Sequence, residues 1–340
     1  MKRLKDKRHF IGIDISNEVL DVSLMNETSH GKFKDKKVDN SFKGFEQMLN
    51  WLIKQKVDLE QSVFCMEHTG TYGLLLFAWL GQMGFDHCVE PGLQIKRSLG
   101  ITRGKNDKVD ARRIADYACT NKAKLKVFAL PSTLIIQIKQ YLTYRDQVVK
   151  INTSLKNSLK NHKTYQKVSG INFISDDIAS QIEENEKRIN QVENMIIDII
   201  SSDPEVKRNF DLATSVKGIG LVIAAFMLVS TNNFTGFENG RKYACYSGIA
   251  PFEYSSGTSI KGAAKTSQIG NKRIKSLLSN GANSARRYDP EIRAYYKRKK
   301  SEGKDHKLII NAISCKLVNR VFATVKRQTP YVTFKHENFI

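Results

Sequence analysis

The first 130 residues constrain the fold most, because short apolar runs typical of buried strands alternate there with longer stretches of helical spacing. Three strand-like runs come first with no helix between them, which predicts an antiparallel meander. Strands and helices then alternate, and this order predicts a mixed α/β sheet with helices on its faces. The predicted strands are residues 9–16, 19–25, 31–38, 62–67 and 85–89, and the predicted helices are residues 41–56, 72–83 and 107–121.

Residues 131–205 have a different pattern, in which apolar side chains recur at alternating intervals of four and three. This heptad spacing predicts a helical coiled-coil arm that doubles back near Gly170. Arg145, Asn152 and Asn185 occupy polar positions in the seam. The pattern is compatible with pairing inside one chain and with pairing between chains. The polar positions, which specify register, favour a homo-oligomer, either a dimer or a tetramer.

Residues 206–340 predict a third, mainly helical domain that follows domains at 1–130 and 131–205. The turn at residues 217–220 resembles the hairpin of helix-hairpin-helix modules, in which backbone N–H groups point at a phosphate. A plain connection between two helices explains the same glycines equally well. Helices are expected at 209–217, 221–229, 241–249 and 271–287, with a loop at 250–270 and one further helix within 300–340.

Lys and Arg outnumber Asp and Glu by 55 to 34, so the chain carries a net charge of +21. Residues 257–340 hold 19 basic and 5 acidic residues, a net charge of +14. Charge of this size favours a polyanionic partner. The tyrosines at 288, 295 and 296 suit stacked bases better than a membrane surface, which requires a strongly apolar opposite face. We therefore expect nucleic acid to bind, with these candidate contacts: Lys217, Gly218, Gly220, Lys261, Lys265, Lys272 and Arg273.

Other patterns argue against whole classes of protein. The five cysteines form no C-x-x-C pair and the seven histidines no H-x-x-x-H pair, so neither a disulfide framework nor a zinc site is indicated. The first 16 residues are basic and lack the apolar stretch of a signal peptide. The longest apolar run, residues 221–229, is too short to cross a bilayer. We expect a cytoplasmic protein.

Four carboxylates stand where strands and helices are predicted to end or begin. Asp14 lies in the first strand and Glu67 ends the fourth. Asp107 and Asp110 share one helix face because they are three residues apart. Each has an ordinary explanation, as a strand-end residue or as an acidic residue in a first helical turn. Together they are the hard oxygen ligands that two Mg²⁺ ions require for phosphoryl transfer. An actin-like ATPase, which can share a G-x-D first strand, would need glycine-rich phosphate loops, and none is convincing here.

A serine-bearing loop, P-F-E-Y-S-S-G at residues 251–257, precedes a basic segment. By composition alone it is an ordinary turn. No Ser-His-Asp spacing is visible, so an independent hydrolase triad is not indicated. A serine that attacked a phosphate would need nearby cations to stabilise the developing charge, and the lysines and arginine at 261, 265, 272 and 273 could supply them.

Five motifs occur in order along the chain: G-I-D-I-S around Asp14, M-E-H-T-G-T-Y-G around Glu67, N-D-K-V-D-A around Asp107 and Asp110, A-P-F-E-Y-S-S-G around Ser256, and Q-I-G-N-K-R-I-K-S-L-L after it. With these motifs the chain resembles the DEDD-type insertion-sequence transposases (insertion-sequence family one-hundred-and-ten), which include the Piv DNA invertases. The resemblance covers residues 9–118 and 210–287, and the helical arm is similar only in kind.

This resemblance implies a RuvC-like, ribonuclease-H-type fold for the first domain, with the four carboxylates as a metal-binding tetrad for Mg²⁺. It implies that the basic domain supplies a nucleophilic serine, Ser256, with Ser255 as the alternative. It also implies DNA recombination guided by a structured RNA that the element encodes, bridging donor and target DNA. Asn106 stands where many relatives have Thr. Since Asn caps a helix as well as Thr does, this departure does not put the metal site in doubt.

Three functions remain open at this point. The first is a Mg²⁺-assisted recombinase that uses the serine as nucleophile. The second is a RuvC-like junction resolvase or nuclease in which water attacks and the basic domain only binds. A covalent protein–DNA adduct would separate these two, because only the first forms one. The third is a non-catalytic nucleic-acid-binding protein with a decayed metal site, which the presence of all four carboxylates and the serine disfavours.

Overall fold

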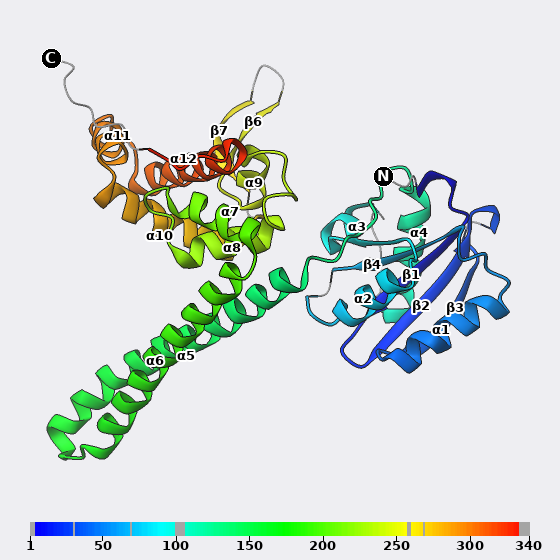
Figure 1. Cartoon of the computed structure of the whole chain (residues 1–340), viewed down its shortest axis with the longest axis horizontal. Coiled ribbons are helices and arrows are strands. Elements are labelled where there is room, and N and C mark those ends of the chain that lie inside the picture. The colour runs from blue at the N-terminus through cyan, green and yellow to red at the C-terminus, as the bar shows by residue number, and fades with distance from the viewer. Residues whose placement is uncertain are drawn as a thin grey trace. The chain divides into compact units, whose positions relative to one another are not determined.

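The computed structural model describes residues 4–29, 31–68, 70–98, 106–256, 260–267 and 269–332, and for residues 253–256 and 260–265 it describes the backbone alone. The side chains of Ser255, Ser256, Lys261 and Lys265 therefore lie outside the described part of the chain. The chain divides into two compact units, Met1–Leu130 and Pro131–Ile340 (Figure 1).

A five-stranded mixed sheet forms the centre of the first unit, in the order β3-β2-β1-β4-β5. The first three strands are an antiparallel meander, whereas β4 pairs parallel with both β1 and β5. Short connections suit antiparallel neighbours and helical crossovers suit parallel ones, so this order follows from where the helices occur in the chain. The predicted mixed sheet is confirmed. Its strands are β1 (His9–Ile15), β2 (Val19–Asn26), β3 (Phe33–Asp39), β4 (Ser62–Glu67) and β5 (His87–Glu90).

Helices cover both faces of this sheet. Successive side chains of β1 point to opposite faces and so pack against different helices. Ile11 and Ile13 are buried in one core cluster with side chains of α1 and α2, whereas Phe10 is buried in another with side chains of α4. The short helix α3 was not predicted, because its sequence is polar and lies in a stretch punctuated by glycine. The helices are α1 (Phe42–Lys54), α2 (Leu74–Gln82), α3 (Gly92–Ser98) and α4 (Asp107–Thr120), with single 3₁₀ turns at Leu4–Asp6 and Glu27–Ser29.

Two long helices form an arm in the second unit, α5 (Thr133–Ser169) and α6 (Phe173–Ser201). The chain reverses at Gly170, whose φ of 71° is a left-handed conformation that glycine adopts without strain. The two helices pack against each other (Figure 1), and the polar seam residues Asn152 and Asn185 are buried along with the apolar ones. The seam therefore closes within one chain. The polar seam positions therefore no longer support an interface between chains.

Further helices and a two-stranded hairpin complete the second unit. The helices on either side of residues 217–220 are present as α7 and α8, and the helix expected within residues 300–340 is α12. These elements are α7 (Pro204–Thr214), α8 (Leu221–Thr231), α9 (Gly240–Tyr246), β6 (Pro251–Ser256), β7 (Ile260–Thr266), α10 (Lys272–Tyr288), α11 (Pro290–Ser301) and α12 (His306–Arg327).

One expectation for this unit was wrong, and one helix was missed. Residues 250–270 are not a simple loop, because β6 and β7 pair there as an antiparallel hairpin. Glycine and alanine, which have low strand propensity, occupy the middle of β7 and hide it from pattern reading. The helix α11 was missed because it lies in a run of basic residues. Asp289 caps it and Pro290 opens it, a combination that could have revealed it.

By length and composition alone, α12 could cross a membrane. In the structure its apolar side chains, among them Ile309, Ile313 and Leu317, are buried in the main core cluster of the second unit. A buried core helix needs the same apolar composition as a membrane span, and the packing of α12 accounts for it. The role of the chain beyond residue 290, which no motif indicated, is thus structural at least in part.

Candidate active site

Asp14 and Glu67 lie at the carboxyl ends of two neighbouring parallel strands. The register pairs Ile13 of β1 with Met66 of β4, and the two acidic residues are the next positions along each strand. Because alternate residues share a face, Asp14 projects on the same face as Phe10, which is the face that α4 covers. The two carboxylates thus share one edge and one face of the sheet.

A close contact between β1 and α4 positions the second pair of carboxylates. A Cβ atom on Gly12 would lie 2.2 Å from the carbonyl oxygen of Ala111 and 2.3 Å from the backbone nitrogen of Ala115. Only glycine permits such an approach. Since Asp110 directly precedes Ala111, the contact holds the first turn of α4 beside the strand end that carries Asp14.

The first turn of α4 is capped and partly neutralised. The side chain of Asn106 accepts a hydrogen bond from the Lys108 N–H at 3.0 Å, so this Asn caps the helix as expected. Asp107 is exposed, whereas Asp110 is half-buried and forms an ion pair with Arg113 at 2.8 Å. Any ligand that binds Asp110 must share this carboxylate with the Arg113 guanidinium.

The electrostatics of Asp14 are those of a site that lacks positive charge. Burial is the largest cause that raises the pKa of Asp14 to about 6, and the charge of Asp110 is the next. Weaker contributions in the same direction come from Asp107, Glu67 and Asp21. Among the described residues, none donates a hydrogen bond to the Asp14 carboxylate or forms an ion pair with it.

Sequence reasoning missed Asp21, which belongs to the same electrostatic group. The antiparallel register places Asp21 of β2 directly opposite Asp14, a like-charge pair that destabilises a sheet. Lys37 of β3 compensates in part, with its Nζ atom 3.7 Å from Asp21 Oδ2. The signal was available, because the two-residue turn between the predicted strands 9–16 and 19–25 sets which residues face each other.

The donor set fits a divalent cation in chemistry, although it is not gathered into a coordination sphere. Carboxylate oxygens are the ligands that Mg²⁺ prefers, and a half-buried Asp14 without a counter-charge favours a cation nearby. Across the ranges that the structure describes, no three His, Cys, Asp or Glu side chains lie close enough to hold a metal ion. A metal would therefore require side-chain movement, above all by Asp110, which Arg113 engages.

A second anchor joins α4 to the sheet at β3. Asp35 accepts hydrogen bonds from Arg112 Nε at 3.0 Å and from the Ser23 hydroxyl at 3.0 Å, and Lys108 lies 3.2 Å away. Burial acts to raise the pKa of Asp35, but the hydrogen bonds from these three residues outweigh it and hold the pKa below its ordinary value. This anchor fixes the helix turn that carries Asp107 and the strands beneath it.

The hairpin β6–β7 carries the candidate serine at the end of its first strand. The register places the Cα atom of Ser256 opposite Ile260 and that of Ser255 opposite Lys261, while the side chains at these positions lie outside the described part. The backbone just before the hairpin is anchored, because the Ile249 carbonyl oxygen accepts a hydrogen bond from Asn311 Nδ2 at 2.7 Å. The serine thus lies on a strand whose start is tied to α12.

The predicted nucleic-acid contacts fall into two groups where their side chains are described. Lys217, Gly220 and Lys272 are exposed, and Gly220 leaves open space around the start of α8. Gly218 instead has a packing role, because a Cβ atom there would lie 2.5 Å from the Gly281 carbonyl oxygen. Arg273 forms an ion pair with Asp146 of α5, which neutralises part of its charge. A role in phosphate binding stays a prediction for all of them.

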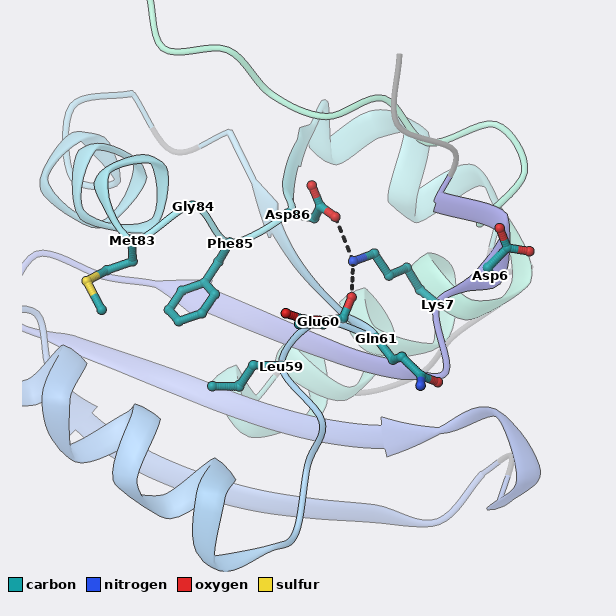
Figure 2. Close-up of a pocket in the computed structure, with 9 residues that line it drawn as sticks. All are labelled: Asp6, Lys7, Leu59, Glu60, Gln61, Met83, Gly84, Phe85 and Asp86. Atoms are coloured by element: carbon teal, nitrogen blue, oxygen red, sulfur yellow. Dashed lines mark hydrogen bonds and ion pairs between the residues drawn. The ribbon is translucent and has the colours of Figure 1, made fainter.

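A pocket of about 580 Å³ lies in the first unit, and none of the predicted site residues lines it. Figure 2 shows Lys7 pointing between Asp86 and the backbone of Glu60, with its Nζ atom 2.6 Å from Asp86 Oδ2 and 2.5 Å from the Glu60 carbonyl oxygen. The Lys7 ammonium group in this pocket is therefore already paired. The pocket carries no part of the chemistry proposed for the carboxylates.

Known proteins resemble the chain along most of its length. Residues 11–164 match the model of a DEDD transposase family of IS110 type, described as a transposase, and residues 211–297 match a family described as "Transposase IS116/IS110/IS902 family". The "Pilin gene-inverting protein" of Moraxella bovis is 27% identical over 333 residues, which is 96% of this chain and 99% of that protein. Its counterpart in Moraxella lacunata is 26% identical over 333 residues, with the same coverage.

A third relative is similar over a shorter stretch. An uncharacterised 43.6 kDa protein of the insertion element IS110 from Streptomyces coelicolor is 33% identical over 118 residues, which is 35% of this chain and 29% of that protein.

Proposed function

The chain belongs to the IS110 family of transposases and is a DNA transposase or recombinase, and we propose that it exchanges DNA strands through a serine nucleophile, Ser256, assisted by Mg²⁺. The observation that carries the proposal is the half-buried Asp14, whose raised pKa and missing counter-charge fit a metal-dependent site. The sheet order, with the carboxylates at one edge, supports a RuvC-like fold for this domain.

Four side chains would hold the metal as two ions: Asp14, Glu67, Asp107 and Asp110. Bound there, Mg²⁺ would lower the pKa of an attacking hydroxyl and stabilise the charge on the leaving oxygen. The carboxylates themselves position the ions and supply the negative charge that binds them. Arg113 sets which rotamer Asp110 adopts before a ligand arrives, since the two side chains are paired.

The Ser256 hydroxyl is the group that attacks in this proposal. Its oxygen forms a bond to the phosphorus of a DNA phosphodiester, the bond to one strand end breaks, and the hydroxyl proton passes to the departing oxygen. The cleaved strand then stays on the protein as a phosphoserine ester. Attack by the hydroxyl end of a second strand reverses these steps and completes the exchange. The proposal requires the serine and the carboxylates to meet at one phosphate when the protein assembles on DNA.

The partners proposed are donor and target DNA, a structured guide RNA and further copies of the chain, acting in the cytoplasm. The net charge of +21 supports the binding of two nucleic acids, because the excess of basic residues is larger than the phosphate contacts of one short duplex require. Sequencing the RNA that co-purifies with the protein tests the guide. A recurring RNA with segments complementary to two DNA sites supports it, and random cellular RNA contradicts it.

The test of the nucleophile is a search for the covalent intermediate. Labelled substrate DNA is incubated with protein and Mg²⁺, quenched in denaturant and separated on a denaturing gel. Wild type should give a protease-sensitive adduct that Ser256→Ala lacks, with Ser267→Ala, just beyond the hairpin, as the matched control. An adduct lost only in Ser255→Ala would assign the nucleophile to that neighbour. Cleavage without an adduct in any variant would instead indicate the resolvase-like alternative, in which water attacks.

A further inference from the structure

A groove lies at the base of the hairpin that carries the candidate serine. One part of it, about 740 Å³, is bounded by Pro251 and Thr266 of the hairpin and by side chains of α10 and α12. A second part of about 190 Å³ lies between α10 and α12, which pack against each other (Figure 1). Lys275, Lys307 and Asn311 line both parts, so the two parts are continuous. We call them together the hairpin-base groove.

Helical spacing brings polar side chains of two helices into this groove. On α10, Lys275, Ser279 and Asn283 follow one another at intervals of four and so share one face. On α12, Lys307 and Asn311 have the same spacing. The apolar faces of both helices are buried in the main core cluster of this unit. The groove is therefore lined by side chains that rigid elements hold in place.

The lysines of the groove have no counter-charge. Lys275 is half-buried, and its Nζ atom donates to Thr266 Oγ1 at 3.3 Å. Within the described ranges, neither Lys275 nor Lys307 forms an ion pair, and no Asp or Glu side chain lines the groove. The Asp305 carboxylate, which caps α12, accepts a hydrogen bond from the backbone N–H of Lys307 at 2.8 Å. A half-buried ammonium group without an opposite charge favours a bound anion.

Other lysines of the same unit are paired, so the two groove lysines are not simply part of an evenly solvated surface. Lys207 and Asp211 form an ion pair at 2.9 Å, and Lys242 pairs with Glu238. Each of these partners lies four residues away on or beside a helix, which is the ordinary way to neutralise a surface lysine. The groove therefore concentrates positive charge that the rest of the unit partly cancels.

The wall of the groove beside the hairpin is apolar. Pro251, Leu308, Ala312 and Cys315 line it, and Leu308 is 63% exposed. Burial raises the pKa of the Cys315 thiol to about 11, so this thiol is neutral at physiological pH and contributes apolar surface, not a nucleophile. Cations next to an apolar wall match a nucleotide, which presents a phosphate together with a sugar and a base.

We propose that the hairpin-base groove binds a backbone phosphate of a nucleic-acid strand between the ammonium groups of Lys275 and Lys307, with the adjoining nucleotide against the apolar wall. The inference rests on the proposed function for the class of partner, and it names a binding site for that partner. DNA and RNA carry the same phosphodiester, so the chemistry is shared, and the experiment below separates the two sources.

The groove is set apart from the position of the serine. Thr266, which accepts from Lys275, faces Pro251 in the hairpin register, and Ser256 lies five residues further along β6. At 3.3 Å per residue this separation is at most roughly 17 Å, the rise of about five stacked nucleotides at 3.4 Å each. The groove phosphate is therefore a different one from the phosphate that the serine would attack. Lys275 and Lys307 are positioning residues, which hold the strand at the base of the hairpin.

The first experiment measures the binding of the full chain to three labelled probes of one sequence: single-stranded DNA, single-stranded RNA and duplex DNA. Lys275→Gln/Lys307→Gln should weaken binding of the strand that occupies the groove about tenfold at low salt. The log–log salt slope should fall by about 0.7 for a single strand or about 0.9 for a duplex, because one neutralised phosphate is lost. Lys275→Arg/Lys307→Arg keeps the charge and should bind as wild type does.

The matched control is Lys43→Gln/Lys54→Gln, which removes the same charge from exposed positions of α1. It should leave the affinity and the slope nearly unchanged. If the groove variant binds all three probes as wild type does, or if the control weakens binding equally, the proposal is overturned.

The second experiment locates the contact by lysine acetylation, read out by mass spectrometry with and without each probe. Lys275 and Lys307 should lose reactivity in the complex with the strand that occupies the groove, whereas Lys43 and Lys54 should keep theirs. Protection by DNA alone or by RNA alone identifies the source of the phosphate. Two groove lysines that react equally with and without every probe contradict the site.

Failure of this inference can be told apart from failure of the proposed serine chemistry. The Lys275→Gln/Lys307→Gln variant should reach the same maximal amount of serine adduct, but at a higher concentration of nucleic acid, as expected of a positioning role. If wild type cleaves DNA without any adduct while both lysines are protected, the serine proposal fails and the groove stands. If the adduct forms and the lysines stay unprotected, this inference alone is overturned.

Discussion

A carboxylate without a counter-charge, such as Asp14, costs free energy when it ionises in the folded protein. Its pKa of about 6, against an ordinary 3.8, means that the folded state keeps this proton where the unfolded chain has lost it. The stability that depends on the protonated group is complete below pH 3.8 and is lost as the pH rises through 6. We predict that Asp14→Asn stabilises the metal-free protein at pH 7 by about 1–2 kcal/mol, discounted for its partial exposure.

Urea unfolding in the presence of a chelator checks this prediction. The free energy of unfolding of the variant should exceed that of wild type at pH 7. The two values should be equal at pH 3.5, where both folded proteins carry a neutral side chain at this position. An equal gain at both values would mean that packing, and not charge, is responsible. Glu46→Gln on the exposed side of α1 is the control and should change neither value.

Single residues were predictable where a local rule applies. Strand alternation placed Asp14 and Glu67 together, and a three-residue spacing placed Asp107 and Asp110 on one helix turn. What escaped were tertiary partners, such as the pairing of Arg113 with Asp110. An ion pair three residues apart on a helix is one of several choices open to an arginine, and only the folded surroundings select it.

At the scale of elements, Asp35 ties β3 to α4 through charge, which makes the placement of the helix sensitive to pH. Because hydrogen bonds hold its pKa below the ordinary 3.8, its contribution is present above that value and is lost as the pH falls through the lower folded pKa. We predict that Asp35→Asn lowers the free energy of unfolding at pH 7 by about 1–2 kcal/mol.

The measurement is urea unfolding of both proteins at pH 7 and pH 2.5. The difference should shrink at the lower pH, because wild type then loses the same charge. If the difference in the free energy of unfolding is the same at both pH values, the loss comes from the hydrogen-bonding geometry of the new amide and not from the missing charge. Strand exchange should also fall, since Arg112 and Lys108, which hold the first turns of α4, lose their partner.

Elements were predictable in proportion to the strength of their patterns. The strands of the first unit and the two arm helices have clear apolar spacing, and they lie near the predicted bounds. Strand β7 of the hairpin has mostly small and basic residues, so no period of two appears in its sequence. For α11, the capping residues Asp289 and Pro290 were the better signal than periodicity, because its exposed surface is almost entirely basic.

For the whole molecule, the uneven charge should govern nucleic-acid affinity. Deleting residues 291–340 would not test this, because α12 belongs to the core of its unit. We predict that neutralising exposed lysines of α11 and the turn after it, Lys297→Gln/Lys300→Gln/Lys304→Gln, weakens duplex binding and flattens the log–log salt dependence by up to about 2.7, since each neutralised phosphate contributes about 0.9.

Fluorescence anisotropy of a labelled duplex at several salt concentrations gives this slope. Lys32→Gln/Lys43→Gln/Lys54→Gln, which changes the same net charge in the first unit, is the matched control. A slope that changes equally in both variants would mean that net charge alone matters. An unchanged slope in the α11 variant would place the phosphate contacts elsewhere on the basic domain.

The length of the arm has a consequence for how far its turn lies from the helices at its base. The 37 residues of α5 extend about 55 Å at 1.5 Å per residue, so the turn at Gly170 lies up to about that distance from α7 and α8, on which the base of the arm packs. That is the length of roughly 16 base pairs at 3.4 Å each. Molecules bound at the two ends of the arm would therefore be held apart by that length.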